Sequence, residues 1–208
     1  INFNGGDLSS DAGLLLIKEF AAKIGFTKLI KKKFKTNDKS VRFHKDHENL
    51  LQMIYQVISA YFQDDCADEL TLDPVFHAVL DKESLASQPT LSRFFNRMDQ
   101  DTLVQFDDID KNLRDIIYSI KRPEHMLLDL DSTLFGTYGK QEGEGFNFHY
   151  QAHGYHPLLC YDGLTGDLIK AELRDGTLYC SNGADKFMKS IFQEYLERGI
   201  KTYLRGDS

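Results

Sequence analysis

Two segments of the chain place aspartates at what we expect to be the ends of β-strands. The segments are Leu128-Asp-Leu-Asp-Ser-Thr133 and Leu204-Arg-Gly-Asp-Ser208. Side chains at the carboxyl ends of neighbouring strands meet at one edge of an α/β sheet, where loops can hold a ligand. Mg²⁺ prefers carboxylate oxygens, and two such ions about 3.5–4 Å apart can promote phosphodiester cleavage and transfer. The candidate metal ligands are therefore Asp129, Asp131 and Asp207.

The same carboxylates could instead serve the local backbone. Aspartate is favoured at helix N-caps and in turns, so Asp129 and Asp131 could cap a turn. Asp207 could likewise cap a following helix. Spacing does not choose between Asp129 and Asp131, because residues two apart share one face of a strand. We prefer Asp131 as the ligand, since it stands at the end of the expected strand.

A basic segment near the start of the chain is a candidate surface for DNA. The net charge of −7 argues against a uniformly basic nucleic-acid binder, but residues 18–45 carry ten basic side chains against two acidic ones. A basic segment on an acidic chain fits a local phosphate-contacting surface. A solvated, Lys-rich helix end would carry the same charges. The candidate contacts in this segment are Lys31, Lys32, Lys33 and Lys35.

Residues 87–98 have the pattern of the recognition helix in a helix-turn-helix motif. Ser87 is a suitable N-cap, and Pro89 is tolerated in the first turn. Helical spacing places short polar and Arg side chains on or near one face, where they could reach a DNA groove. Helices that bind nothing can show the same pattern. The polar set is Ser92, Arg93, Asn96 and Arg97, and the set expected to face the core is Leu91, Phe94, Phe95 and Met98.

Apolar periodicity divides the chain near Pro123. Before it, the spacing predicts helices within residues 14–24, 28–35, 46–61, 74–80, 87–98 and 103–120. After Pro123 the spacing of apolar residues falls toward every second residue, as in β-strands. Glycine is also concentrated there, since 11 of the 15 glycines follow residue 135. There we expect strands at 126–131, 155–161 and 168–173, a helix at 184–198 and a fourth strand at 200–204.

This order of elements predicts an α/β chain of two regions. The second region has the order of the opening half of a ribonuclease-H-like fold. It consists of three strands that can pair antiparallel, then a helix, then a further strand that we expect to be parallel. We therefore expect an all-helical DNA-binding region at 1–122 and a partial ribonuclease-H-like catalytic domain at 123–208. Three cysteines are too few and too scattered for a disulfide framework. The chain has no run of ~20 apolar residues and no signal segment at its start, so we expect a cytoplasmic protein without a membrane partner.

An ordered set of sequence blocks also resembles a known family, and together these blocks extend over essentially the whole chain. The blocks are Leu8-Ser-Ser-Asp-Ala-Gly-Leu-Leu-Leu16, Asp65-Cys-Ala-Asp-Glu-Leu-Thr-Leu-Asp-Pro74, Ala86-Ser-Gln-Pro-Thr-Leu-Ser-Arg93, Leu128-Asp-Leu-Asp-Ser-Thr133, Tyr138-Gly-Lys-Gln-Glu-Gly143, Gly154-Tyr-His-Pro-Leu-Leu159 and Leu204-Arg-Gly-Asp-Ser208. In this order they resemble the DDE transposases of bacterial insertion sequences, specifically the IS-thirteen-eighty-like group.

The resemblance implies a catalytic site and a reaction. The family's first two catalytic carboxylates fall on Asp131 and Asp207, and its third acid lies downstream and has no position in this sequence. The chain would therefore be a fragment, truncated before the third acid and incomplete as an enzyme. The complete enzyme would use two Mg²⁺ or Mn²⁺ ions. Water would free a 3′-OH at the transposon end, and that hydroxyl would attack target DNA.

The implied partners are double-stranded DNA, as transposon ends and target, and a second copy of the chain in the synaptic complex. Two other functions remain open from the sequence. The chain could be a catalytically inactive DNA-binding fragment, or it could come from an unrelated ribonuclease-H-like nuclease.

Overall fold

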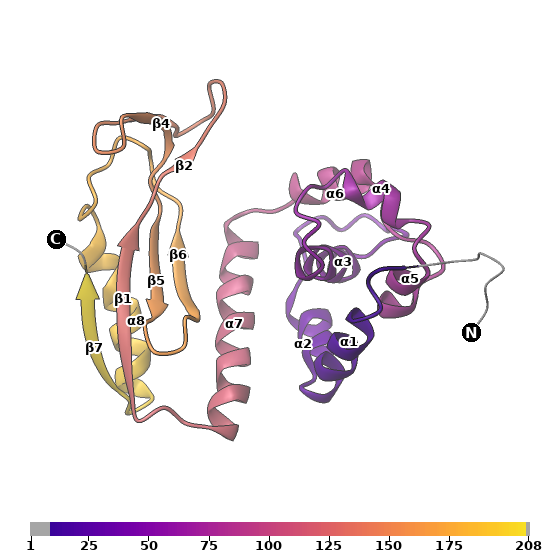
Figure 1. Cartoon of the computed structure of the whole chain (residues 1–208), viewed down its shortest axis with the longest axis horizontal. Coiled ribbons are helices and arrows are strands. Elements are labelled where there is room, and N and C mark those ends of the chain that lie inside the picture. The colour runs from indigo at the N-terminus through magenta and orange to yellow at the C-terminus, as the bar shows by residue number, and fades with distance from the viewer. Residues whose placement is uncertain (1–8, 207–208) are drawn as a thin grey trace. The chain divides into compact units, whose positions relative to one another are not determined.

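The computed structural model describes residues 9–206, which fall into two compact units separated after Ile120. Figure 1 shows the helical unit and the sheet-containing unit with most of their elements labelled. Each unit has its own core and is described separately. Asp207, the second expected catalytic residue, lies outside the described residues.

The first unit is entirely helical, as its apolar periodicity predicts. Local signals fix several boundaries. Gly25 adopts a left-handed conformation (φ 74°) between the first two helices, and the Asp73 carboxylate caps the fifth helix by accepting hydrogen bonds from Val75 N (2.7 Å) and Phe76 N (3.1 Å). The helices are α1 (Leu14–Lys23), α2 (Phe26–Lys33), α3 (Asp46–Ile58), α4 (Cys66–Leu70), α5 (Pro74–Leu80), α6 (Gln88–Phe95) and α7 (Gln100–Ile120).

The core of the helical unit draws on α2, α3, α6 and α7. Leu91 and Phe94 of α6 are fully buried, as expected. Phe95 was expected to face the core as well, and this prediction is wrong, because its side chain is 45% exposed. Leu91 and Phe94 lie three residues apart and define the buried face, whereas Phe95 is rotated about 100° from Phe94 at the last position of the helix. The buried cluster formed by these helices is Ile30, Phe34, Leu50, Leu51, Phe94 and Ile109. A second cluster, which also draws on α1, α4 and α5, is Leu14, Tyr55, Leu70, Phe76, Val79 and Leu85.

A buried glutamine joins α3 to the segment before α6. Gln52 donates from Nε2 to Ala86 O and accepts at Oε1 from Ala86 N, both at 2.8 Å. Replacing Gln52 with leucine would leave both backbone groups of Ala86 buried and unpaired. We expect the free energy of unfolding to fall by about 2 kcal/mol. Urea denaturation measures it, and a loss below about 0.5 kcal/mol would contradict the structural role of this pair.

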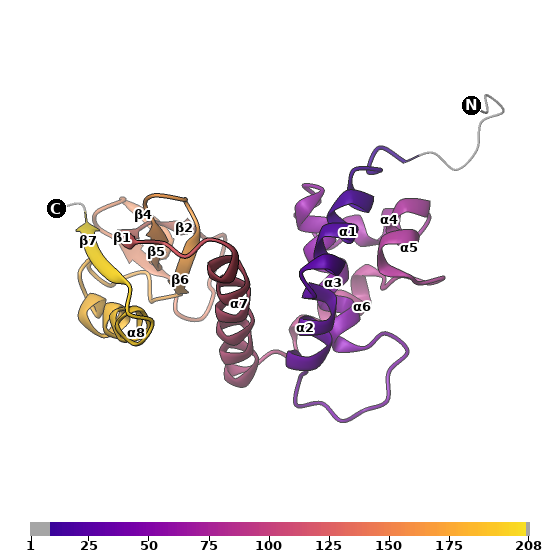
Figure 2. The ribbon, with the colours of Figure 1, turned by 90° about the horizontal axis from the view of Figure 1, so that it is seen from below.

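The second unit is built on a mixed four-stranded sheet in the order β6-β5-β1-β7. Strand β1 (His125–Ser132) pairs antiparallel with β5 (Leu158–Asp162), and β5 pairs antiparallel with β6 (Leu168–Glu172). Helix α8 (Ala184–Glu197) leads to β7 (Lys201–Gly206), which pairs parallel with β1. Figure 2 shows α8 along one face of this sheet. The three antiparallel strands, the helix and the parallel strand agree with the sequence-based prediction.

A small second sheet was not predicted. It has the order β2-β4-β3, with β2 (Phe135–Gly136), β3 (Gly145–Asn147) and β4 (Ala152–Tyr155). The expected strand at 155–161 is therefore divided: Tyr155 ends β4, and Pro157, which has no N–H to donate, stands before β5. A β-carbon at Gly154 would lie 2.3 Å from Phe135 O, so this close pairing of β4 with β2 requires glycine.

Candidate functional site

Strand β1 carries Asp129 and Asp131 on the face of the sheet that is turned away from α8. Met126 and Leu128 of the same strand are completely buried, and Leu130 lines a pocket together with Met188 of α8. Because side chains alternate along a strand, the two aspartates point to the opposite face. The alternation predicted from the sequence thus separates a core side from a polar side of β1.

Asp129 forms a bidentate ion pair with Arg205 of β7. The parallel register places these residues opposite each other, and Arg205 donates from Nε to Oδ1 (2.8 Å) and from Nη2 to Oδ2 (2.5 Å). Both carboxylate oxygens of Asp129 are thus engaged by a cation. The pair also ties β7 to β1 near the ends of both strands, three residues before the end of β1 and one before the end of β7, which makes Asp129 a suitable residue for positioning this edge.

Asp131 is the exposed carboxylate at the end of β1. Its Oδ1 accepts a hydrogen bond from Ser132 N at 2.7 Å, and among the described residues no donor is bonded to its second oxygen. Asp131 lines an open pocket of about 590 Å³ with Tyr161, Asp162, Gly163 and the Asp129–Arg205 pair. Asp131 is therefore the more accessible of the two β1 carboxylates for a ligand.

The strand end beside Asp131 is held by a tyrosine. Tyr150 donates from its hydroxyl to Ser132 O at 2.9 Å. Burial, then the neighbouring Cys180 and Asp131, raise the pKa of Tyr150, so the hydroxyl keeps its proton and remains a donor at neutral pH. This hydrogen bond fixes the backbone directly after Asp131.

The register of β7 relates the two acid-containing segments. Gly206 pairs with Leu130, the residue before Asp131, and Asp207 is the next residue after Gly206 in the sequence. Within residues 9–206, no group of three or more His, Cys, Asp or Glu side chains lies close enough together to hold a metal ion. The described residues thus contribute carboxylates to this edge without completing a metal site.

The expected DNA-contacting lysines lie at and just after the end of α2. Lys31, Lys32 and Lys35 are exposed, whereas Lys33 is half-buried and lies 3.5 Å from the Asp108 carboxylate. The Lys35 backbone is anchored, because its N–H donates to Gln105 Oε1 at 2.9 Å. Three of the four lysines are therefore free to reach a phosphate.

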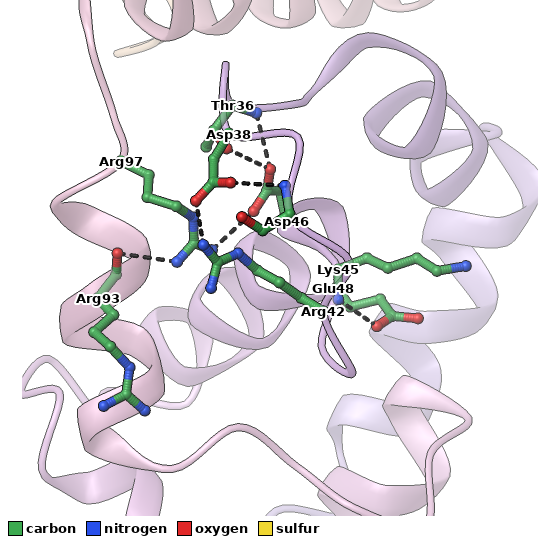
Figure 3. Close-up of polar contacts among 9 residues, drawn as sticks. Thr36, Asp38, Arg42, Lys45, Asp46, Glu48, Arg93 and Arg97 are labelled. Atoms are coloured by element: carbon green, nitrogen blue, oxygen red, sulfur yellow. Dashed lines mark hydrogen bonds and ion pairs between the residues drawn. The ribbon is translucent and has the colours of Figure 1, made fainter.

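The polar set of residues 92–97 is divided by the end of α6. Ser92 is half-buried and Arg93 is exposed on the helix, while Asn96 is exposed at the C-cap and Arg97 follows it. Arg97 is turned inward, as Figure 3 shows: its Nη2 donates to Asp46 Oδ1 at 2.8 Å, its Nη1 donates to Arg93 O at 3.0 Å, and its side chain is 11% exposed. The structure thus gives Arg97 a role in holding α6 to α3.

Comparison with known proteins identifies the family to which the chain belongs. The family model described as "Transposase DDE domain group 1" matches residues 1–208, the full length of the chain. The chain belongs to the DDE transposase family. No curated protein and no solved structure matches it. A helical region followed by a mixed sheet with aspartates at a strand end is consistent with this membership.

Two polar residues that line a pocket of this chain were missed by the sequence interpretation. Asn49 of α3 is 1% exposed, and Arg42 lies in the loop before α3; both line a pocket next to α6. A signal for Asn49 was present, because Asn49, Gln52 and Gln56 follow each other at helical spacing on a face that also carries core residues. Across residues 9–206, no helix is long and apolar enough to cross a bilayer.

Proposed function

We propose that this chain is part of an insertion-sequence transposase that binds transposon ends and catalyses divalent-metal-dependent cleavage and transfer of DNA strands. The observation that carries the proposal is the family match over the full chain, combined with an accessible Asp131 at the end of β1. The sequence blocks assign the chain more finely to the IS-thirteen-eighty-like group. An unrelated nuclease is disfavoured by the same family match.

The strand order supports a ribonuclease-H-like catalytic domain. Three antiparallel strands are followed by a helix and a strand that returns parallel to the first. In this arrangement the ends of β1 and β7 lie at the same edge, because parallel strands run in one direction. Asp131 and Asp207 are the acids associated with those two ends, and we propose them as the catalytic pair.

The donor chemistry of this edge fits a hard divalent cation. Asp131 offers a carboxylate oxygen that is not bonded to any described donor, and Asp207 would supply a second carboxylate. Asp129 is the less suitable ligand, because Arg205 binds both of its oxygens. We assign Asp129 the role of positioning β7. When bound, Mg²⁺ or Mn²⁺ would supply Lewis-acid activation to the scissile phosphodiester and the attacking hydroxyl.

The protein's own groups orient this chemistry. The Tyr150–Ser132 hydrogen bond fixes the backbone at Asp131. We propose that Ser132 and Thr133 contact the DNA strand end. Neither hydroxyl acts as a nucleophile, because water and the 3′-OH of DNA serve in that role.

The DNA-binding surface that we propose lies in the helical unit. It comprises side chains near the α2 C-terminus and on or just after α6, all exposed except the half-buried Ser92. Lys33 and Arg97 contribute less because each has an acidic partner. Contacts of this kind bind phosphates and make affinity fall as salt rises. A pair of protein copies would hold two transposon ends together. The proposed contacts are Lys31, Lys32, Lys35, Ser92, Arg93 and Asn96.

A cleavage assay tests this function. The protein that carries this chain is incubated with a plasmid that contains its own insertion sequence, in Mg²⁺ or in EDTA. We expect strand breaks at the element ends in Mg²⁺ and none in EDTA, since phosphodiester transfer at this site depends on the divalent ion. Absence of end-specific breaks with both Mg²⁺ and Mn²⁺, from a protein that is folded and binds the ends, would contradict the catalytic proposal.

A further inference from the structure

A pocket in the helical unit lies between the loop before α3 and helix α6. Its volume is about 270 Å³. It brings together side chains that are about 40–50 residues apart in the sequence, and Figure 3 shows three of them, Arg42, Arg93 and Arg97, with their polar contacts. The polar residues that line it are Arg42, His44, Asn49, Thr90, Arg93 and Arg97.

Two residues that line this pocket carry buried donors without partners. Asn49 is 1% exposed, and neither its Nδ2 nor its Oδ1 is hydrogen-bonded within residues 9–206. Arg97 Nε is likewise buried and unpaired there, although the other two nitrogens of this guanidinium are bonded to Asp46 and to Arg93 O. Buried polar groups are nearly always paired, so two donors left at one pocket indicate a ligand that accepts hydrogen bonds.

The charges around the pocket leave one arginine uncompensated. Arg42 is paired with Asp38, and Arg97 is paired with Asp46. Arg93 has no carboxylate at ion-pair distance among the described residues. His44 adds no charge at neutral pH, because burial and then the neighbouring Lys82 lower its pKa. The pocket thus has an excess of one positive charge.

We propose that this pocket binds one phosphodiester group of DNA. Arg93 supplies the uncompensated positive charge for the single negative charge of the diester, and Asn49 Nδ2 and Arg97 Nε donate hydrogen bonds to its oxygens. The Asn49 carbonyl oxygen accepts a hydrogen bond from a water that enters with the anion. The assignment rests on the DNA binding proposed above and locates one of its phosphate contacts. Inorganic phosphate offers the same chemistry and is the second source to be tested.

Binding of duplex DNA by the full chain tests the proposal. We expect Arg93→Gln and Asn49→Leu each to weaken affinity about tenfold, the usual effect of losing one charge-assisted hydrogen bond. Arg93→Gln should also reduce the slope of log affinity against log salt by about 1. Lys189→Gln is the charge-matched control, because Lys189 is exposed on α8, outside both the basic segment 18–45 and helix α6. It should change affinity by less than about twofold.

Thermal stability separates a ligand-binding asparagine from a structural one. Leucine has the branched shape of asparagine, the pocket beside it can take up its larger volume, and it removes an unpaired buried amide, so Asn49→Leu should melt at the wild-type temperature or higher. Weaker DNA binding without a loss of stability supports the pocket. A clear fall in melting temperature would instead assign Asn49 a structural role, and Arg93→Gln then decides the question, because Arg93 is exposed and its replacement does not disturb the core.

Titration with inorganic phosphate distinguishes failure of the pocket from failure of the proposed function. The readout is the ¹⁵N–¹H signals of the Asn49 side-chain amide and of Arg97 Nε. Phosphate-dependent shifts of these signals that disappear in Arg93→Gln support an anion site in the pocket. If these shifts are seen but the protein does not bind DNA, the pocket stands and the proposed DNA-binding function is contradicted. Normal DNA affinity in both variants together with unshifted signals would overturn the pocket and leave the function standing.

Discussion

Replacing Asp131 with asparagine is expected to lower the rate of DNA end cleavage at least about 10³-fold while DNA affinity changes by less than about threefold. Asparagine keeps the shape of the side chain but loses the negative charge that a divalent cation requires, and such an ion supplies several kcal/mol of transition-state stabilisation. Folding should be unaffected, because the Asp131 side chain is exposed and its recorded hydrogen bond, from the adjacent Ser132 N, can also be accepted by an amide oxygen. Single-turnover cleavage and an anisotropy titration measure the two quantities.

Two further variants make this result specific. Asp107→Asn, an exposed position on α7, removes the same charge elsewhere and should cleave at the wild-type rate. Asp129→Asn should reduce cleavage by about 10–100-fold, the range typical of a group that positions a ligand, because it breaks the pair with Arg205. The reverse order, with Asp129→Asn inactive and Asp131→Asn near normal, would transfer the ligand role to Asp129.

The main sheet could be predicted from the sequence because each of its strands carries a local signal. Strand β1 alternates buried Met126 and Leu128 with the less buried His125, Leu127 and Asp129, and α8 shows clear helical spacing. The small sheet could not be found in this way. Its strands are two to four residues long and lie among glycines, so no period of two can develop, and only tertiary pairing such as that of β4 with β2 defines them.

The parts of the candidate site that lie at strand ends could be predicted from the sequence. The contacts that depend on how two strands are aligned with each other could not. Asp131 stands at the end of β1 as expected. The engagement of Asp129 by Arg205 depends on the parallel register between residues 76 apart, which no local pattern contains. Arg97 is a similar case: helical spacing placed it on the polar side of 87–98, but its direction is decided by Asp46, 51 residues away.

The largest effect on the free energy of unfolding is expected from breaking the ion pair between Asp46 and Arg97. Asp46 accepts three hydrogen bonds: at Oδ1 from Arg97 Nη2 (2.8 Å), and at Oδ2 from Thr36 N (2.9 Å) and Thr36 Oγ1 (2.7 Å). It therefore joins the start of α3 to the chain after α2 and to the end of α6. Asp46→Asn would leave the Arg97 charge, whose side chain is 11% exposed, without its counterion. We expect the free energy of unfolding to fall by about 3 kcal/mol at pH 7, measured by urea denaturation.

Acid should remove the difference in the free energy of unfolding between wild type and Asp46→Asn. The direction of this pH dependence follows from the pKa of Asp46. Burial acts to raise that pKa, but hydrogen bonds from Arg97 and Thr36 and the charge of Arg97 outweigh burial, so the pKa is lowered in the folded protein. The unfolded chain therefore takes up a proton first. The stabilisation is complete above the unfolded value of about 4 and is lost as pH falls through the lower folded value. The gap between wild type and Asp46→Asn should be constant from pH 5 to 8 and shrink by pH 3, whereas Asp107→Asn should track the wild type throughout. A gap of the same size at pH 3 as at pH 7 would show that the Asp46 charge does not hold these three elements together.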